Sequence, residues 1–404
     1  MKILHINCTD DGSTGKIIQD ISACAASRGH ENYLCTPQIT HENPSIKKIK
    51  TSVQHEQGLY LRIAKLLGFQ YGFAPVSTSR ILRTIQQVKP DVVHLHSINC
   101  NIVNIYKLLG FLKKNHIPTV VTNHAEFFYT GSCAYSYFCE NWKTGCGNCE
   151  SYKTSCASVW DSSHLAWRKM KKAFSGFQEA RVVSVSPFTY SRSKQSPIME
   201  GIEQRVVLNG IDTEIFRPYP AQENDGMQGE KLVAYVTAFF DPLEDDRKGS
   251  AHVVELARRF SGENVRFLVI GKSTSKKVDL PANMTIVGFV ADQKQLAQYY
   301  SMADVSLITS KRETFSMPVA ESLACGTPLV GFLAGGPESI AIKDFCSFVD
   351  FGDVDALEEL LRNGWLTKKE ELGVQTIAAE AEKVYAGNIM AQKYLDIYQE
   401  LLTP

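Results

Sequence analysis

The feature that most constrains the fold is a repeated alternation of short apolar runs, rich in β-branched residues, with longer helical patterns. Strands of this kind are predicted at residues 1–7, 91–96, 119–123, 180–186 and 204–208. A second series is predicted at residues 232–237, 265–270, 284–287, 305–309 and 329–332. Strands that alternate with helices favour parallel βαβ units, so the chain is expected to form two α/β domains with parallel sheets.

The chain length agrees with two domains, because 404 residues exceed what one core usually organises. The segment Asn209–Pro218 and the polar stretch that follows it to Gly229 separate the two series of strands. We therefore predict one domain at residues 1–210 and a second at residues 211–385. A long helical pattern at residues 379–402 ends the chain.

Composition favours a globular protein, with 44% hydrophobic and 21% charged residues. No apolar run approaches the ~20 residues that span a bilayer. The N-terminus is too short and too polar for a signal peptide and reads as a first strand. The expected location is cytoplasmic, where the 11 cysteines would be thiols or metal ligands rather than disulfides.

Charge is segregated along the chain although the formal net charge is zero. Residues 1–210 carry 24 Lys and Arg against 14 Asp and Glu, whereas residues 211–404 carry 19 against 29. A basic first half suggests an anionic partner such as a phosphate or a lipid head group. Such a charge difference also occurs without any function.

Two glutamates eight residues apart mark the best candidate site. Glu313 follows a predicted strand, and Glu321 lies on the helix that comes next. Ligands of parallel α/β sheets bind at the carboxyl ends of strands, and two acceptor-only groups there suit the hydroxyls of a sugar and a ribose. The alternative is that Glu313 only stabilises the start of the helix through its dipole and that Glu321 is a solvated helix residue.

The segment from Glu313 to Pro328, with Phe315 after the first glutamate and Ala-Cys-Gly-Thr-Pro after the second, resembles the E-x7-E motif of retaining family 4 glycosyltransferases with the GT-B fold. The Asn-Gly-Ile-Asp of residues 209–212, followed by Phe-x-Pro, is similar to their interdomain linker. The resemblance implies that Glu313 contacts the hydroxyls of the donor sugar and that Glu321 contacts the ribose. It implies contacts to the nucleotide sugar from Phe315, Ser316 and Met317, and a last helix, residues 386–404, that crosses back to the first domain.

The loop Asp10–Lys16 joins the first strand to a helix expected at residues 15–28. Gly12, Ser13 and Gly15 would let backbone amides approach a phosphate or a sugar, as the family's Gly-rich loop does. A simple tight turn is the alternative. The loop is neither a Walker A motif nor a dinucleotide fingerprint, which disfavours a nicotinamide dehydrogenase.

Cations follow the first strand of the second domain, in the segment Asp241–Gly249. Lys248 matches the lysine that family members place before a glycine, where it would neutralise a departing nucleoside diphosphate. The upstream arginine of the family is missing here, and Arg247 is the candidate substitute. The alternative, a solvated basic pair, is weakened because cations at a helix start oppose the dipole.

His124 follows a buried strand of the first domain, where the family has a histidine that contacts the donor sugar. The aspartate that often comes next is Ala125 in this chain. A neutral histidine both donates and accepts hydrogen bonds. His94 and His96 lie within a strand and are expected to be structural.

Four cysteines, Cys133, Cys139, Cys146 and Cys149, lie within 17 residues. Their thiolates could close a structural zinc site, and two disulfides are the alternative in an oxidising compartment. The insertion at residues 130–156 resembles that of the colanic-acid and O-antigen branch of the family, which implies bacterial surface polysaccharide assembly. No catalytic metal is expected, because a site closed by four thiolates has no open position.

Three basic and apolar segments of the first domain could dock on an anionic membrane: residues 59–73, 107–114 and 167–174. Ordinary amphipathic helices packed on a sheet are the alternative. Docking would place the protein at the inner face of the plasma membrane, where polyprenyl-diphosphate-linked acceptors reside. No nucleic-acid partner is expected.

The resemblance implies transfer of a hexose from a nucleoside-diphosphate sugar, the co-substrate, to a hydroxyl of a growing and lipid-linked glycan. It implies retention of the anomeric configuration by front-face attack, so that no side-chain nucleophile is required. Glu313, Lys248, Arg247 and His124 are then the expected catalytic residues. A nucleotide-sugar epimerase of the same fold and a non-catalytic glycan-binding protein remain as alternatives.

Overall fold

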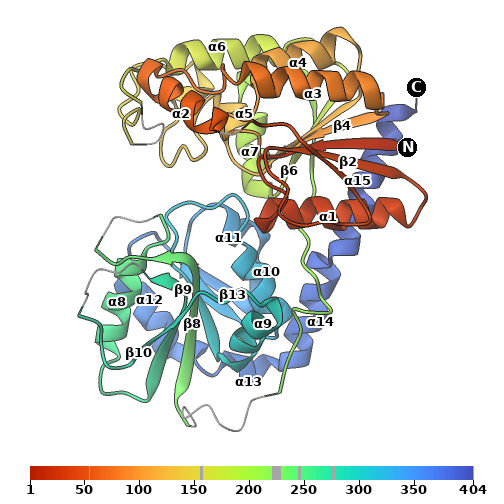
Figure 1. The fold of residues 1–404 in the computed structure, drawn as a ribbon. Helices are drawn as coiled ribbons and strands as arrows, with labels where there is room; N and C mark the ends of the chain where they lie inside the picture. Colours follow the sequence, from red (N-terminus) through yellow and green to blue (C-terminus); the bar gives the residue numbers. More distant parts are fainter. Residues whose placement is uncertain (54, 155–157, 221–228, 244–246, 274–278, 404) are drawn as a thin grey trace. The chain divides into compact units, whose positions relative to one another are not determined.

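The computed structural model describes residues 1–403, except 54, 155–157, 221–228, 244–246 and 274–278. The chain divides into two compact units. The first unit comprises residues 1–208 and 388–404, and the second comprises residues 209–387. The C-terminal residues therefore belong to the same unit as the N-terminal strand (Figure 1).

The first unit is built on a seven-stranded sheet with the order β3-β2-β1-β4-β5-β6-β7. All its pairings are parallel. Its strands are β1 (Lys2–Ile6), β2 (Glu31–Thr36), β3 (Lys47–Lys50), β4 (Val92–Leu95), β5 (Thr119–Asn123), β6 (Ala180–Ser184) and β7 (Glu203–Val206). Its helices are α1 (Gly12–Ala26), α2 (Glu56–Leu67), α3 (Pro75–Val88), α4 (Ile105–Lys114), α5 (Phe127–Thr130), α6 (Ser163–Phe174), α7 (Pro187–Lys194) and α15 (Gly387–Leu402), with short 3₁₀ turns η1 (Asn141–Lys143) and η2 (Pro197–Met199).

Alternating side chains of this sheet bury two apolar faces. Leu4, Val93 and Val121 face the core that α3, α4 and α6 complete. Ile3 and Val92 face the opposite core, to which α1 and α15 contribute. A parallel sheet covered on both faces explains why its central strands are almost entirely apolar.

The second unit repeats the architecture with six parallel strands in the order β10-β9-β8-β11-β12-β13. The strands are β8 (Lys231–Phe240), β9 (Val265–Ser273), β10 (Met284–Gly288), β11 (Val305–Ile308), β12 (Leu329–Phe332) and β13 (Cys346–Val349). The helices are α8 (Ser250–Arg259), α9 (Gln293–Met302), α10 (Met317–Ala324), α11 (Gly336–Ile340), α12 (Val354–Leu360), α13 (Lys368–Leu372) and α14 (Val374–Tyr385), with η3 (Lys343–Phe345) and the π turn η4 (Leu361–Trp365).

Each strand order reverses once, between β1 and β4 in the first sheet and between β8 and β11 in the second. Such a switch point opens a crevice at the carboxyl ends of the two strands, where open α/β sheets bind ligands. Each unit therefore has one predicted ligand-binding edge.

The terminal helical pattern at residues 379–402 is formed by two helices, and the second begins close to residue 386, where the last helix was expected to start. Helix α14 ends at Tyr385, Ala386 adopts an extended conformation, and α15 begins at Gly387. Ala386 also forms an isolated parallel bridge with Ile211. None of the described helices combines the length and the hydropathy that crossing a membrane requires.

Candidate functional site

In the second unit, the loop that follows β8 is hydrogen-bonded to the residue that follows β11. The carbonyl oxygen of Lys248 accepts hydrogen bonds from the Tyr235 hydroxyl and from Thr309 Oγ1, each at 2.8 Å. Gly249 has a φ of +75°, and a Cβ there would lie 2.2 Å from the Thr309 carbonyl oxygen. Glycine is therefore required beside the lysine, and the loop fixes the backbone of Lys248 at the switch point. Residues 244–246 of this loop lie outside the described residues.

Lys248 and Glu313 form an ion pair across this edge. The distance from Lys248 Nζ to Glu313 Oε1 is 2.5 Å, and Ser310 Oγ donates to the same oxygen at 2.9 Å. The side chains are 24% and 11% exposed, so little water separates the charges. The structure thus brings together two residues that the sequence predicted as catalytic, one from the loop after β8 and one from the loop after β11.

The backbone of Glu313 is held by the loop after β12. Glu313 donates its N–H to the carbonyl oxygen of Ala334 at 3.0 Å, and Gly336 donates its N–H to the carbonyl oxygen of Glu313 at 2.9 Å. A Cβ on Gly336 would lie 2.6 Å from the Phe315 nitrogen. This second loop therefore packs directly against the segment that carries the carboxylate.

Sequence reasoning missed this supporting loop. The Glu338 carboxylate accepts hydrogen bonds from the N–H groups of Ala334 at 3.0 Å and Gly335 at 2.6 Å. The signal was present: a Gly-Gly pair at residues 335–336, shortly after the strand predicted at residues 329–332, followed by Pro337 and a glutamate suited to cap a helix start.

The three predicted donor-binding residues after Glu313 lead into α10. Phe315 is 3% exposed and packs inward, whereas Met317 is partly exposed at the first helical position. Ser316 has φ 87° and ψ 90°, which is rare for a residue with a Cβ and costs on the order of 1–3 kcal/mol. The N–H groups of the helix start lie just beyond it, and such groups favour negative charge.

Glu321 lies further along α10 and has a partner of its own. The hydroxyl of Tyr300, on α9, donates to Glu321 Oε2 at 3.1 Å. Burial, followed by the neighbouring carboxylate, raises the pKa of Tyr300 well above its usual value, so it remains a donor. Glu321 is therefore oriented separately from the Lys248–Glu313 pair. Arg247 neighbours Lys248, and its carbonyl oxygen accepts from the Lys311 N–H at 2.8 Å.

In the first unit, the glycine-rich segment starts a helix earlier than expected. Helix α1 begins at Gly12, so Ser13 and Gly15 lie within its first turn. Gly12 and Ser13 are exposed, and Gly12 has a φ of +70°. Gly15 is buried, and a Cβ there would lie 2.6 Å from the Asp10 carbonyl carbon. The structure therefore gives Gly15 a packing role, while Gly12 and Ser13 are accessible.

Two polar side chains that sequence reasoning passed over hold this segment. Asp10 accepts hydrogen bonds from Thr40 and forms an ion pair with Lys48, with 2.8 Å between Lys48 Nζ and Asp10 Oδ2. Burial alone would raise the pKa of Asp10, but these partners outweigh it and lower the pKa to about 2. Asn7 donates to Thr14 Oγ1 at 3.0 Å and accepts from the Ser97 N–H at 3.0 Å. The loops after β1 and β4 are thereby joined.

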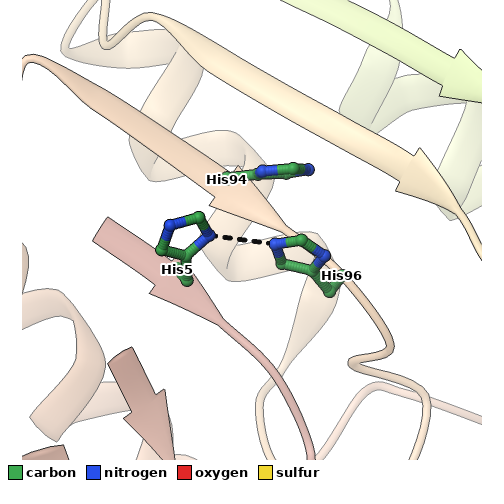
Figure 2. Close-up of side chains that lie close together, drawn as sticks. All are labelled: His5, His94 and His96. Atoms are coloured by element: carbon green, nitrogen blue, oxygen red, sulfur yellow. Dashed lines mark hydrogen bonds between the residues drawn. The ribbon is translucent and has the colours of Figure 1, made fainter. Parts of the chain in front are cut away.

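His124 follows β5 and belongs to a cluster of histidines. His5 Nδ1 lies 3.0 Å from His96 Nε2, and His96 Nδ1 lies 3.1 Å from His124 Nε2. The ring of His94 lies over that of His96, with centroids 3.7 Å apart. Figure 2 shows His5, His94 and His96 gathered on neighbouring strands, with the hydrogen bond between His5 and His96. His94 and His96 are buried within the sheet, while His124 is partly exposed at its edge.

Burial makes all four histidines neutral at physiological pH. It lowers the pKa values of His5 and His124 to about 3. The pKa values of His94 and His96 are lowered well below the usual value by burial and then by neighbouring histidines.

The zinc site predicted at Cys133, Cys139, Cys146 and Cys149 stays a prediction. Among the described residues, the group that could hold a metal ion comprises His5, His94 and His96. Cys139 is exposed, and the Cys146 thiol lies 3.7 Å from the Thr130 carbonyl oxygen. The end of the expected insertion, residues 155 and 156, lies outside the described residues.

Buried polar contacts secure part of this segment. Glu126 accepts a hydrogen bond from Ser136 Oγ at 2.6 Å and pairs with Arg192 at 3.3 Å. The Arg192 guanidinium also lies over the Trp142 ring, 4.7 Å from its centroid. The insertion is thus anchored to Arg192 of α7 and to Glu126, which lies two residues after His124.

The architecture can be compared with known structures. Sucrose-phosphate synthase from Thermosynechococcus elongatus shares the fold at a TM-score of 0.70, with 17% identity and 99% of each chain covered. Anabaena HepE in complex with UDP matches at a TM-score of 0.66, with 15% identity over 99% of this chain and 100% of the other. Two parallel-sheet units of this kind define the GT-B class of glycosyltransferases.

The sequence narrows that class to a family. The model described as Glycosyltransferase Family 4 matches residues 14–215, half of the chain, and the model described as Glycosyl transferases group 1 matches residues 227–379. The chain belongs to glycosyltransferase family 4. It is also 24% identical, over 80% of each chain, to WcaC of Escherichia coli K12, which is named as a colanic acid biosynthesis glycosyl transferase.

Proposed function

We propose that the protein transfers a hexose from a nucleoside-diphosphate sugar to a hydroxyl of a growing bacterial surface glycan, with retention of anomeric configuration. The observation that carries the proposal is the Lys248–Glu313 ion pair at the switch point of the second sheet. A cation there can receive the charge of a departing diphosphate, and a carboxylate can accept hydrogen bonds from sugar hydroxyls. The relationship to a colanic acid transferase supports the glycan acceptor.

In this proposal Glu313 orients the transferred sugar, and Lys248, assisted by Arg247, stabilises the leaving phosphate. Glu321 binds the ribose, while Phe315, Ser316 and Met317 place the start of α10 beside the diphosphate. At the edge of the first sheet, ligand contacts come from Gly12, Ser13, Gly15 and His124. His124 forms a hydrogen bond with a sugar hydroxyl. The leaving phosphate takes the proton of the acceptor, so no side-chain nucleophile and no catalytic metal are needed.

The test is transfer by the Glu313→Ala variant. We expect at least a hundredfold loss of kcat/KM, because the variant removes a group that orients the reacting sugar. Circular dichroism and the melting temperature verify the fold. A UDP-, GDP-, dTDP- and CMP-sugar binding panel identifies the donor, beginning with UDP-glucose because HepE has been crystallised with it. Normal turnover by a folded variant contradicts the role of Glu313, and conversion of a donor without acceptor indicates an epimerase.

We further propose that the acceptor is linked to a polyprenyl diphosphate and that the first unit docks on the inner face of the plasma membrane. Between α4 and α6 lies a basic groove of about 720 Å³, lined by Lys113, Leu165, Trp167, Arg168, Lys169, Lys171, Lys172 and Ser175. Leu165 is 46% exposed there. Cations beside exposed apolar side chains suit an anionic lipid surface.

Co-sedimentation with phosphatidylglycerol vesicles tests the docking proposal. Binding is expected at low salt and should weaken when Lys169→Glu and Lys172→Glu are combined, because screening and charge reversal both remove the attraction. A charge-matched control carries Lys294→Glu and Lys343→Glu, two exposed lysines of the second unit. Absence of binding at low salt overturns the membrane proposal but leaves the transferase proposal standing.

A further inference from the structure

The histidine cluster joins the interior of the first sheet to the residue at its edge. Hydrogen-bond contacts form one continuous series, from His5 through His96 to His124. His5 and His96 are fully buried, while His124 is partly exposed. A hydrogen-bonded series that begins in the core and reaches the predicted ligand-binding edge can fix the tautomer of the histidine at that edge.

Metal binding is the first explanation to consider, because one nitrogen from each of His5, His94 and His96 lies within 4.8 Å of the others. Both nitrogens of His94, however, are engaged by hydroxyls: Nδ1 by Tyr398 at 2.6 Å and Nε2 by Thr122 at 2.7 Å. The pKa values of the three histidines are lowered by burial and by other histidines, and no carboxylate among the described residues contributes. A buried dication with neutral ligands alone is costly, so the contacts favour neutral imidazoles that bind one another.

Neutral imidazoles give the series a direction. Each ring has one N–H donor and one acceptor nitrogen, so all contacts must point the same way along the series. Either the protons point from His5 toward His124 or they point from His124 toward His5. The tautomer of every ring follows once one end is known.

The buried end of the series decides between the two directions. His5 Nε2 has no hydrogen-bond partner among the described residues. A buried N–H without an acceptor is rarer in proteins than an acceptor without a donor. The proton of His5 therefore belongs on Nδ1, from which it is donated to His96 Nε2. His96 then donates its own Nδ1–H to His124 Nε2.

We propose that His5 and His96 are positioning residues that hold His124 in the tautomer with its proton on Nδ1. In that tautomer His124 Nδ1 is a hydrogen-bond donor, so a ligand atom that contacts it is an oxygen lone pair, and Nδ1 does not remove a proton. The inference concerns the tautomer of His124 and rests on the proposed function only for the consequence of that tautomer in sugar binding.

The tautomer can be measured directly in the full-length protein with ¹⁵N-labelled histidine. In two-bond ¹H–¹⁵N spectra at neutral pH, the wild type should show His124 protonated on Nδ1 and unprotonated on Nε2. His96→Leu removes the donor and should leave a mixture of tautomers. His96→Asn places an amide N–H near the former Nδ1 and should restore the single tautomer.

Two controls separate the series from general packing. Tyr398→Phe removes the hydroxyl partner of His94 within the same cluster but no contact of the series, so the His124 signal should be unchanged. A wild-type spectrum with His124 protonated on Nε2 overturns the proposal. Stoichiometric zinc binding that is lost in His5→Phe overturns it as well, because the cluster would then be a metal site.

Activity provides the second readout. His96→Leu should lower kcat on the order of tenfold, as loss of a partner that orients a histidine typically does, and His96→Asn should recover most of it. If the tautomers are as expected but His124→Ala transfers sugar normally, the proposed role of His124 fails while the positioning series stands. If His124→Ala is inactive and both His96 variants keep one His124 tautomer, the positioning series fails.

Discussion

At the scale of single residues, the ion pair between Lys248 and Glu313 gives each group a substitute for its proposed ligand. The lysine contacts a carboxylate where a diphosphate would lie, and the carboxylate contacts a cation and the Ser310 hydroxyl where sugar hydroxyls would lie. A charge that is neither solvated nor paired is expensive in such a partly buried site. We infer that donor binding exchanges these contacts without creating an unpaired charge.

Lys248→Gln should therefore weaken binding of the nucleoside diphosphate about 10- to 100-fold, because a hydrogen bond to a charged group contributes about 1.5–3 kcal/mol. Binding of the nucleoside without phosphates should be unchanged. Isothermal titration calorimetry measures both affinities. Lys294→Gln, at an exposed position on α9, is the matched control. Equal losses for nucleoside and nucleoside diphosphate would show that the lysine does not contact phosphate.

The residues that sequence reasoning missed share one property. Asp10, Asn7 and Glu338 act through partners that are distant in sequence or through backbone groups of a loop whose shape the sequence does not reveal. The pairing of Lys248 with Glu313 joins residues that are 65 positions apart. The candidate residues could be chosen from motifs, but their roles in binding and catalysis stay predictions.

At the scale of elements, the loops after β8, β11 and β12 support one another. Gly249 allows the first loop to contact the end of β11, and Gly336 allows the third loop to contact the segment from Glu313 to Phe315. The position of the carboxylate therefore depends on close backbone packing, which is sensitive to a single added methyl group.

Gly336→Ala should displace Glu313, because its Cβ would lie 2.8 Å or less from three backbone atoms of residues 313–315. Overpacking of this kind typically costs 1–3 kcal/mol, and we expect at least a tenfold loss of kcat/KM. Urea unfolding and steady-state kinetics measure the two effects. The control is Gly110→Ala on α4, where a Cβ meets nothing within 4 Å and should stabilise the helix slightly. A fully active Gly336→Ala would show that the loop tolerates the displacement.

The GT-B fold prediction is confirmed, and it succeeded where strands are central and apolar. The strand expectations missed β2, β3 and β13. Strand β3 reads Lys-Lys-Ile-Lys and lies at a sheet edge, where charge protects against unwanted pairing and hides the strand pattern. The change from α14 to α15 at Ala386 lies where the last helix was expected to begin, although the helical pattern at residues 379–402 runs across it, because one extended residue leaves the periodicity almost intact.

At the scale of the whole molecule, the units share an architecture, but their histidines are unevenly distributed, and we expect acid to destabilise the first unit. Nine of the ten histidines lie in residues 1–208, and His252 is the exception. His5 and His124 have pKa values lowered by burial to about 3, against a usual value of 6.5. Below pH 6.5 the unfolded chain binds protons that the folded unit does not bind, so acid favours unfolding of the first unit.

The stability of the first unit should be nearly constant above pH 6.5 and should decline as the pH falls toward 3. A fully buried histidine contributes up to about 1.4 kcal/mol per pH unit in that range. Unfolding of this unit can be followed by tryptophan fluorescence. Trp142, Trp160 and Trp167 report on the first unit alone when Trp365 of the second unit is replaced by phenylalanine. His5→Phe should reduce the slope of the free energy of unfolding against pH by the equivalent of about one proton. An unchanged slope in that variant would contradict the assigned burial of a neutral His5.

The arrangement of α15 has a consequence for how the protein is made. Its apolar side chains share a core with Ile3, Val92 and Val120, although a complete second unit separates them in the sequence. On the ribosome, the chain for residues 209–387 is finished before the last helix exists, so the second unit can fold while the first still lacks part of its core. A prematurely terminated chain would expose the open side of the first sheet, which chaperones and proteases recognise as incomplete.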